Sequence, residues 1–179
     1  MRFQAFIFLL FPVLLNAQTD SIINYTGVVS VDGVTKDDLF VRARQWYNET
    51  FKSAKDVLQI SDKETGELSG KGIVNVVVKY KSMGQRAYDS PCRTAISIWV
   101  KDGRYKYSFT NFQIEIGGNA ASELSVLTSS KTCPDKWPMV RQSKMDEIWE
   151  GAKEGTRVSV EQLINSLNDR MKKKADNDF

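Results

Sequence analysis

The sequence predicts an α+β domain in which an antiparallel sheet of roughly five strands carries two helices on one face. Two stretches repeat apolar residues at helical spacing, one near the start of the chain and one at its end. Between them, runs of alternating apolar and polar residues are separated by tight turns, which join antiparallel strands. The elements are therefore expected in the order strand, helix, four strands, helix.

The start of the chain has the pattern of a secretory signal peptide. A single charge at Arg2 precedes the apolar run Phe6–Leu15 and the small residue Ala17. The apolar run has about ten residues, whereas a membrane-spanning helix needs about 20. We therefore expect removal of residues 1–17, export to the periplasm or the extracellular space without a transmembrane anchor, and a single domain over residues 18–179.

The first strand and the first helix follow directly. The strand is expected over Ile22–Val31, where β-branched residues dominate before an Asp-Gly turn. The helix is expected to begin after Thr35, because the Thr35 side chain can accept a hydrogen bond from the backbone N–H of Asp38. Its buried stripe consists of Leu39, Ala43, Trp46, Thr50, Phe51 and Ala54. Polar residues, Arg42 among them, are expected on the other faces.

A first hairpin is expected in the middle of the chain. It joins a short strand over Val57–Ile60 to a longer strand over Gly70–Tyr80 through the polar turn Asp62–Gly66. The longer strand alternates apolar with polar residues, with Val74, Val76, Val78 and Tyr80 on one face.

The second hairpin joins Thr94–Lys101 to Arg104–Ile116 through Asp102-Gly103, because Asp-Gly readily adopts the positive φ values of a type I′ turn. A two-residue turn fixes the register of the two strands. The expected core-facing pairs are Val100 with Tyr105, Ile98 with Tyr107 and Ile96 with Phe109.

A long loop over about residues 117–140 and a second helix are expected at the end of the chain. The loop contains glycines, serines and two prolines, although Ala120–Leu127 could form one helical turn. The helix has an apolar stripe of Met145, Ile148, Trp149, Ala152, Val160, Leu163, Ile164, Leu167 and Met171. Gly151 and Gly155 are expected to break it into two pieces.

The two cysteines, Cys92 and Cys133, favour one structural disulfide in an oxidising compartment, with two free thiols as the alternative. The bond would close a loop of about 40 residues, which the chain-entropy model credits with roughly 3–4 kcal/mol. The chain has no CxxC motif, and two isolated cysteines are too few for a structural zinc site. No metal or cofactor is predicted.

The region from Val29 to Phe112 resembles a secreted domain-of-unknown-function family of Gram-negative bacteria described as having a TBP-like fold. The resemblance rests on VSVDGVTKDDLFVRARQWYNETFKSAKDVLQISDKETGELSGKG (Val29–Gly72) and IWVKDGRYKYSFTNF (Ile98–Phe112). These stretches hold the strand-turn-helix opening, the K-D/E-x-G turn and the KDGRYKY hairpin. The resemblance implies a curved antiparallel sheet backed by two helices, and it implies no catalytic residues.

Composition excludes several classes of function. The absence of histidine rules out Ser-His-Asp, Cys-His and histidine-metal mechanisms. Lysine and arginine number 25 against 22 acidic residues, and the two signs are mixed along the chain, which argues against nucleic-acid binding. Carboxylates or a Ser–Lys pair remain for an enzyme. The obvious carboxylate pair, Asp37-Asp38, is better explained by its place in the first turn of a helix.

The register of the second hairpin also defines a candidate binding face on the side of the sheet away from the helices. Its members are Ser97, Trp99, Lys101, Arg104, Lys106 and Ser108, with Asn75, Val77 and Lys79 from the neighbouring strand. A solvent-facing tryptophan among cations is typical of binding hot spots. The alternative is that Trp99 stabilises its own cross-strand pair or is covered by the long loop.

Three functions remain as hypotheses. The leading one is a non-enzymatic periplasmic or secreted module that binds a protein, peptide or glycan through the candidate face. The second is a hydrolase of cell-envelope material that uses carboxylates or a Ser–Lys pair. The third is a structural component whose C-terminal helix docks on another copy or on a membrane surface through Met145, Trp149 and Met171.

Overall fold

A computed structural model of the chain describes residues 20–51, 57–116 and 124–173. The elements are β1 (Tyr25–Ser30), α1 (Lys36–Thr50), β2 (Leu58–Asp62), β3 (Glu67–Lys81), β4 (Gln85–Lys101), β5 (Arg104–Glu115), β6 (Leu124–Val126) and α3 (Gln142–Lys172). The strands form one antiparallel sheet in the order β1-β5-β4-β3-β2, with β6 added beside β5. The predicted α+β class and element order are confirmed, with β6 as an extra strand. The expected signal peptide lies outside the described residues, as does Ala54.

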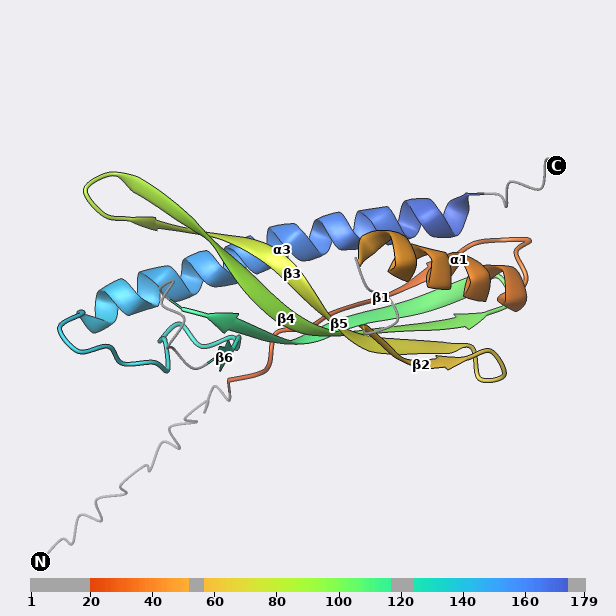
Figure 1. The fold of residues 1–179 in the computed structure, drawn as a ribbon, viewed down its shortest axis with the longest axis horizontal. Coiled ribbons are helices and arrows are strands. Elements are labelled where there is room, and N and C mark those ends of the chain that lie inside the picture. The colour runs from red at the N-terminus through yellow and green to blue at the C-terminus, as the bar shows by residue number, and fades with distance from the viewer. Residues whose placement is uncertain (1–19, 52–56, 117–123, 174–179) are drawn as a thin grey trace, which may run out of the picture.

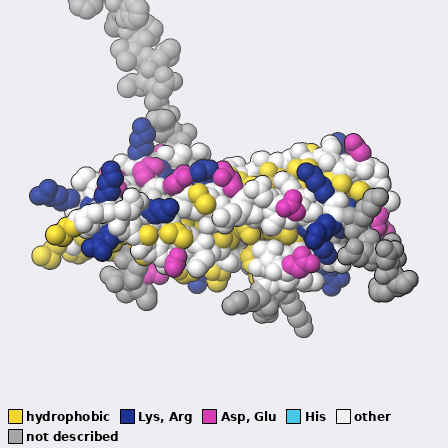
Figure 2. Space-filling view, turned by 90° about the horizontal axis from the view of Figure 1, so that it is seen from above, with side chains coloured by type: hydrophobic (Ala, Val, Ile, Leu, Met, Phe, Trp, Pro, Cys, Tyr) yellow, Lys and Arg dark blue, Asp and Glu magenta, His cyan; other side chains and the backbone are white. Residues whose placement is uncertain are grey.

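Both helices cover the same face of a twisted sheet (Figure 1). The long helix α3 runs the length of the molecule, and α1 lies beside its C-terminal half. Between the helices and the sheet lies a core with many large side chains, the bulkiest of which are Trp46, Tyr47, Tyr105, Phe109, Phe112 and Trp149. Figure 2 looks down on the helix side, where basic and acidic side chains are interspersed.

The start of α1 is as predicted, because the backbone N–H of Asp38 donates to the Thr35 hydroxyl at 3.2 Å. The buried position of Arg42 differs from the expectation that it lies outside the buried stripe. Its guanidinium donates to the backbone carbonyl of Met171 at 2.7 Å, inside the contact between α1 and α3. Arg42 thereby supplies a hydrogen bond and a positive charge to the C-terminal end of α3.

The predicted register of the second hairpin is confirmed. Val100 pairs with Tyr105, and Trp99 pairs with Lys106 on the opposite face, as the Asp-Gly turn requires. The strand β4 begins nine residues earlier than the predicted start at Thr94, and it forms a long hairpin with β3. The pairing of β4 with β5 ends at Cys92, next to Pro91 in this added part. Proline has no backbone N–H to donate, and no β5 residue pairs with it at this position.

The segment from Leu124 to Val126 forms the strand β6, so the proposed helical turn over Ala120–Leu127 is wrong for its described part. These residues pair with Gln113–Glu115 at the edge of β5. Leu127 continues the contact, because its N–H donates to Phe112 and its carbonyl accepts from Ile23. An unpaired strand edge offers backbone partners that an isolated helical turn lacks.

The helix α3 is continuous, so the expectation that Gly151 and Gly155 break it is wrong. Each glycine lies against a backbone carbonyl at the free edge of β3. An added Cβ would stand 2.1 Å from the carbonyl oxygen of Lys79 at position 151, and 2.4 Å from that of Val77 at position 155. Four helical residues rise about 6 Å and two strand residues about 6.7 Å, so this contact repeats along both elements. The glycines therefore permit close approach.

The predicted disulfide is not formed in this structure, where Cys92 and Cys133 are buried free thiols. The two residues contact different parts of α3. The Cys92 thiol lies beside the hydroxyl of Thr156, whereas the backbone N–H of Cys133 donates to Asp146 at 2.9 Å. Ten helical residues separate these contacts, or about 15 Å of rise, whereas disulfide-linked Cα atoms lie about 4.4–6.8 Å apart.

None of the helices formed by the described residues has both the length and the hydropathy needed to cross a bilayer.

Candidate functional site

The side of the sheet opposite the helices, which none of the described helices or strands covers, forms a platform that we call the open face. Its side chains alternate along each strand with those of the core. Its members include Thr26, Val28, Ser30, Glu67, Ser69, Lys71, Ile73, Arg93, Ala95, Ser97, Trp99, Lys101, Arg104, Lys106, Ser108, Thr110, Asn111, Gln113 and Glu115. The cross-strand pairs place these side chains in rows that run across β1, β5, β4 and β3.

One end of the open face contains the predicted tryptophan and its cation. Lys106 lies over the ring of Trp99, with its amine 5.4 Å from the ring centroid. Glu67 occupies the position beside Trp99 on β3. The structure thus brings together the predicted pair, and an exposed cation–π contact of this kind contributes about 0.5–1 kcal/mol.

The next row carries hydroxyl groups. Ser97 pairs with Ser108 on one side and with Ser69 on the other. The hydroxyls of Ser69 and Ser97 lie 3.0 Å apart, and Ser69 also lies 2.7 Å from the carboxylate of Glu67. The remaining predicted pair, Lys101 and Arg104, is placed beside the turn. The six predicted hairpin residues therefore share one surface, and their role in binding stays a prediction.

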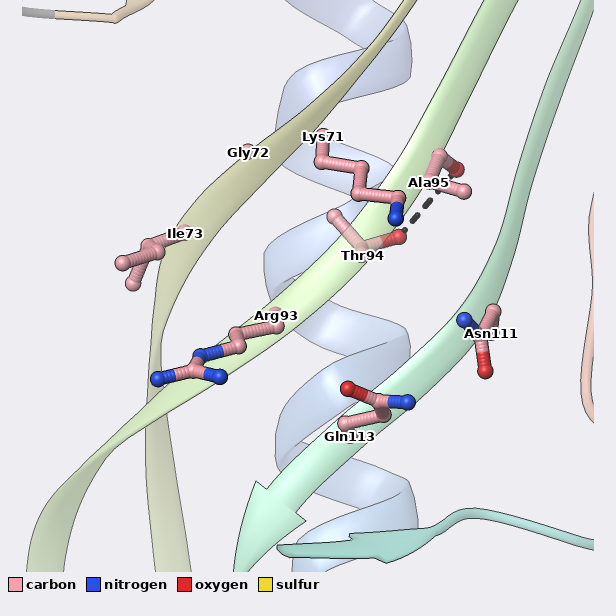
Figure 3. Close-up of a pocket in the computed structure, with 8 residues that line it drawn as sticks. All are labelled: Lys71, Gly72, Ile73, Arg93, Thr94, Ala95, Asn111 and Gln113. Carbon is pink, nitrogen blue, oxygen red and sulfur yellow. Dashed lines mark hydrogen bonds between the residues drawn. The ribbon is translucent and has the colours of Figure 1, made fainter. Parts of the chain in front are cut away.

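A pocket of about 350 Å³ lies further along the open face (Figure 3). It is lined by Lys71, Gly72, Ile73, Arg93, Thr94, Ala95, Asn111 and Gln113. Figure 3 shows the long side chains of this set projecting from three neighbouring strands, with α3 behind the sheet. This pocket could not be predicted from the sequence, because Arg93 lies before the predicted start of its strand at Thr94, and its pairing with Ile73 was not predicted.

A one-residue irregularity in β5 shapes the pocket. The register between β4 and β5 shifts between Arg93 and Ala95, and Asn111 adopts a left-handed backbone conformation with φ of 55°. The extra residue is a β-bulge, which lets Phe109 and Phe112 both face the core. Gln113 is thereby placed directly opposite Arg93 on the open face.

Both charged residues that line the pocket, Lys71 and Arg93, are basic. Lys71 and Arg93 occupy diagonal positions on adjacent strands, since Lys71 pairs with Ala95 and Ile73 with Arg93. Diagonal neighbours of this kind lie roughly 7–8 Å apart at Cα. In the part of the chain that the structure describes, neither cation takes part in an ion pair. The pocket therefore presents two unneutralised positive charges beside two side-chain amides.

A second groove, of about 630 Å³, lies between the edge of β3 and α3. It includes the remaining predicted residues, Asn75, Val77 and Lys79, which the structure separates from Trp99. Its wall on α3 carries Glu150 and Glu154. Adjacent carboxylates could support hydrolysis if one of them donated a proton.

Each of these carboxylates is held by a cation on its own helix. Arg157 contacts Glu154 at 2.6 Å, and Lys153 contacts Glu150 at 2.5 Å. The hydrogen bonds from Arg157 hold the pKa of Glu154 below its usual range, which keeps that carboxylate ionised at neutral pH. A glycosidase needs the opposite, because one carboxyl group must have a raised pKa to donate a proton.

Within residues 20–51, 57–116 and 124–173, no three Cys, Asp or Glu side chains lie together in a group that could hold a metal ion.

The fold and its open face define a class of protein, the α+β domains with a TBP-like arrangement of an open antiparallel sheet backed by helices. No curated protein matches the sequence. The chain belongs to the family described as "Domain of unknown function (DUF4468) with TBP-like fold", which it matches over residues 25–115. This confirms the resemblance found in the sequence.

Two solved structures share the fold. A TBP-like protein from Parabacteroides distasonis superimposes with a TM-score of 0.60 at 13% identity, covering 84% of this chain and 92% of that chain. A DUF4468 family protein from Bacteroides ovatus superimposes with a TM-score of 0.62 at 13% identity, covering 89% of this chain and 92% of that chain. At this identity the likeness establishes the fold.

Proposed function

We propose that the protein is an exported, non-enzymatic binding domain that holds a protein, peptide or glycan partner against its open face. The single observation that carries this proposal is the uncovered row containing Trp99 and Lys106, on a sheet whose other face is occupied by both helices. Aromatic residues next to cations dominate the energetics of many binding surfaces. Export after removal of residues 1–17 forms part of the same proposal.

The double variant Trp99→Ala/Lys106→Ala tests the proposal. Immobilised protein should capture a partner from a cell-envelope extract, and the double variant should lose that capture while its melting temperature changes little. The matched control is Val41→Ala/Arg44→Ala, which removes an exposed aliphatic and an exposed cation from α1 on the helix side. Equal capture by the wild type and the Trp99→Ala/Lys106→Ala variant would refute the assignment of this face.

Two other hypotheses have less support. A Ser–Lys hydrolase requires a lysine amine beside a serine hydroxyl. Lys36, Lys144 and Lys153 are occupied otherwise, because they donate to backbone carbonyls or carboxylates. The carboxylates in the groove are ion-paired, as described above. Docking through Met145, Trp149 and Met171 is opposed by the burial of all three side chains in the protein's own core.

The export step has its own measurement. Mass spectrometry of the protein recovered from the periplasm or the medium should give an N-terminus at Gln18. Recovery of the full-length chain from the cytosol would contradict export and leave the binding assay unaffected.

A further inference from the structure

We propose that the open face binds an acidic glycan, with the carboxylate of one uronic acid residue held in the pocket formed by Lys71, Arg93, Asn111 and Gln113. The inference rests on the proposed function, since it assigns a ligand class to the same face.

The positive charge of the pocket favours the binding of an anion. Lys71 and Arg93 lie on adjacent strands, and the described residues provide neither with an ionic partner. Two nearby cations repel each other until an anion lies between them. The guanidinium of Arg93 can form two parallel hydrogen bonds to a carboxylate, and the amides of Asn111 and Gln113 add further N–H donors.

The size of the pocket fits one ring of a chain ligand. Its volume of about 350 Å³ is at the lower end of the roughly 300–1,000 Å³ typical of ligand sites. The pair Lys71 and Ala95 of the pocket is followed on the same face by the pair Ser69 and Ser97, so a longer ligand can continue from the pocket along the serine row. Arg93 and Trp99 are six residues apart on β4, which corresponds to about 20 Å. A ligand that reaches both therefore spans several sugar residues.

The surface between these two points favours a glycan over a peptide. It carries the hydroxyls of Ser69, Ser97, Ser108 and Thr110. Hydroxyl groups both donate and accept hydrogen bonds, which matches the hydroxyls of a sugar chain. One common mode of peptide binding adds a strand to a free sheet edge, and β4 offers no such edge because it is paired on both sides along this stretch. Trp99 then provides an apolar surface for a sugar ring at the far end.

Calorimetric titration with defined oligosaccharides tests this inference. The probes are hexamers and trimers of galacturonate and of mannuronate, with a neutral galactose hexamer and a hexaglutamate peptide for comparison. At least one uronate hexamer should bind, and Arg93→Gln and Lys71→Gln should each weaken it at least tenfold. Trp99→Ala should weaken the hexamer at least fivefold and leave the trimer unchanged, because the trimer does not span the distance to Trp99.

The control variant is Arg44→Gln, which removes an exposed cation from α1 on the other side of the molecule. It should bind the uronate hexamer as the wild type does. A failure of both uronate hexamers to bind, unchanged binding by Arg93→Gln, an equal loss in Arg44→Gln, or tighter binding of hexaglutamate would each overturn the inference. If uronates fail while capture from envelope extract still depends on Trp99 and Lys106, the proposed function stands and the ligand class is wrong.

Discussion

Gly151 of α3 lies against the backbone carbonyl of Lys79, so close that a Cβ at residue 151 would stand 2.1 Å from the oxygen. Real side chains do not tolerate this approach, so the contact requires glycine at this position. The same relationship recurs one turn later between Gly155 and Val77. Together the two glycines seat α3 on the edge of β3.

Replacing Gly151 with alanine should therefore destabilise the protein. In an ordinary helix, glycine to alanine stabilises by about 0.5–1 kcal/mol. Here the added methyl group overpacks a backbone contact, and we expect a loss of about 1–3 kcal/mol in the free energy of unfolding. Urea unfolding measures it. Asn165→Ala, at an exposed position of α3, is the control and should be neutral or slightly stabilising. Stabilisation by Gly151→Ala would contradict the close approach.

The buried Arg42 should contribute to stability through the end of α3. Arg42→Met keeps most of the side-chain length and removes the hydrogen bond to the carbonyl of Met171. A hydrogen bond from a charged group typically contributes about 1.5–3 kcal/mol, so the variant should lose about 1–3 kcal/mol in the free energy of unfolding. Arg44→Met, two residues along but exposed, should change it by less than about 0.5 kcal/mol. Equal effects from the two variants would disprove the role of Arg42.

The thiols of Cys92 and Cys133 should be present but unreactive in the native protein. Burial raises the pKa of Cys92 to about 12 and also raises that of Cys133. Only the thiolate reacts with disulfide reagents, so labelling at pH 8 should be slow in buffer and rapid in urea. Both thiols should be counted in urea without a reductant. A count of zero would indicate that the two cysteines form the bond predicted from the sequence.

The free energy of unfolding should decrease at alkaline pH, because burial raises the pKa of several groups in the native protein. The pKa of Cys92 is higher in the folded protein than in the unfolded chain, so above about pH 9 the unfolded chain loses a proton that the native state retains. Fewer protons on the unfolded chain mean that the free energy of unfolding decreases as pH rises, by at most about 1.4 kcal/mol per pH unit for each such group. Burial raises the pKa of Tyr47 and Tyr105 as well, which steepens the fall.

Urea unfolding at pH 8, 9.5 and 10.5 measures this dependence. The variants Cys92→Ala and Tyr47→Phe should each show a shallower loss than the wild type. A free energy of unfolding that stays constant from pH 8 to 10.5 would contradict the burial of these groups.

Local chemistry explains which parts of the fold could be predicted. The start of α1 follows from Thr35 and Asp38, and the β4–β5 register follows from a two-residue turn. Both depend on residues close together in the sequence. The role of Gly151 could not be predicted, because the carbonyl of Lys79 reaches it only after α3 packs on the sheet.

The same distinction applies to the candidate site. The two-residue Asp-Gly turn predicts that Trp99 pairs with Lys106, and the structure places them together. Lys71, Arg93 and Gln113 could not be grouped in this way. Their association depends on the extension of β4 before Thr94, where Gln85–Arg93 is mostly polar and contains a proline, and on the bulge in β5.

The bulge at Asn111 changes the surface of the domain without changing its core. If Asn111 took a regular place in the β4–β5 pairing, every later residue of β5 would switch faces, turning Gln113 inward and Ile114 towards water. Because Asn111 is extra to that pairing, Phe112 and Ile114 stay in the core and Gln113 stays opposite Arg93. The extra residue therefore adds one amide side chain to the wall of the pocket at no cost to the alternation of the strand.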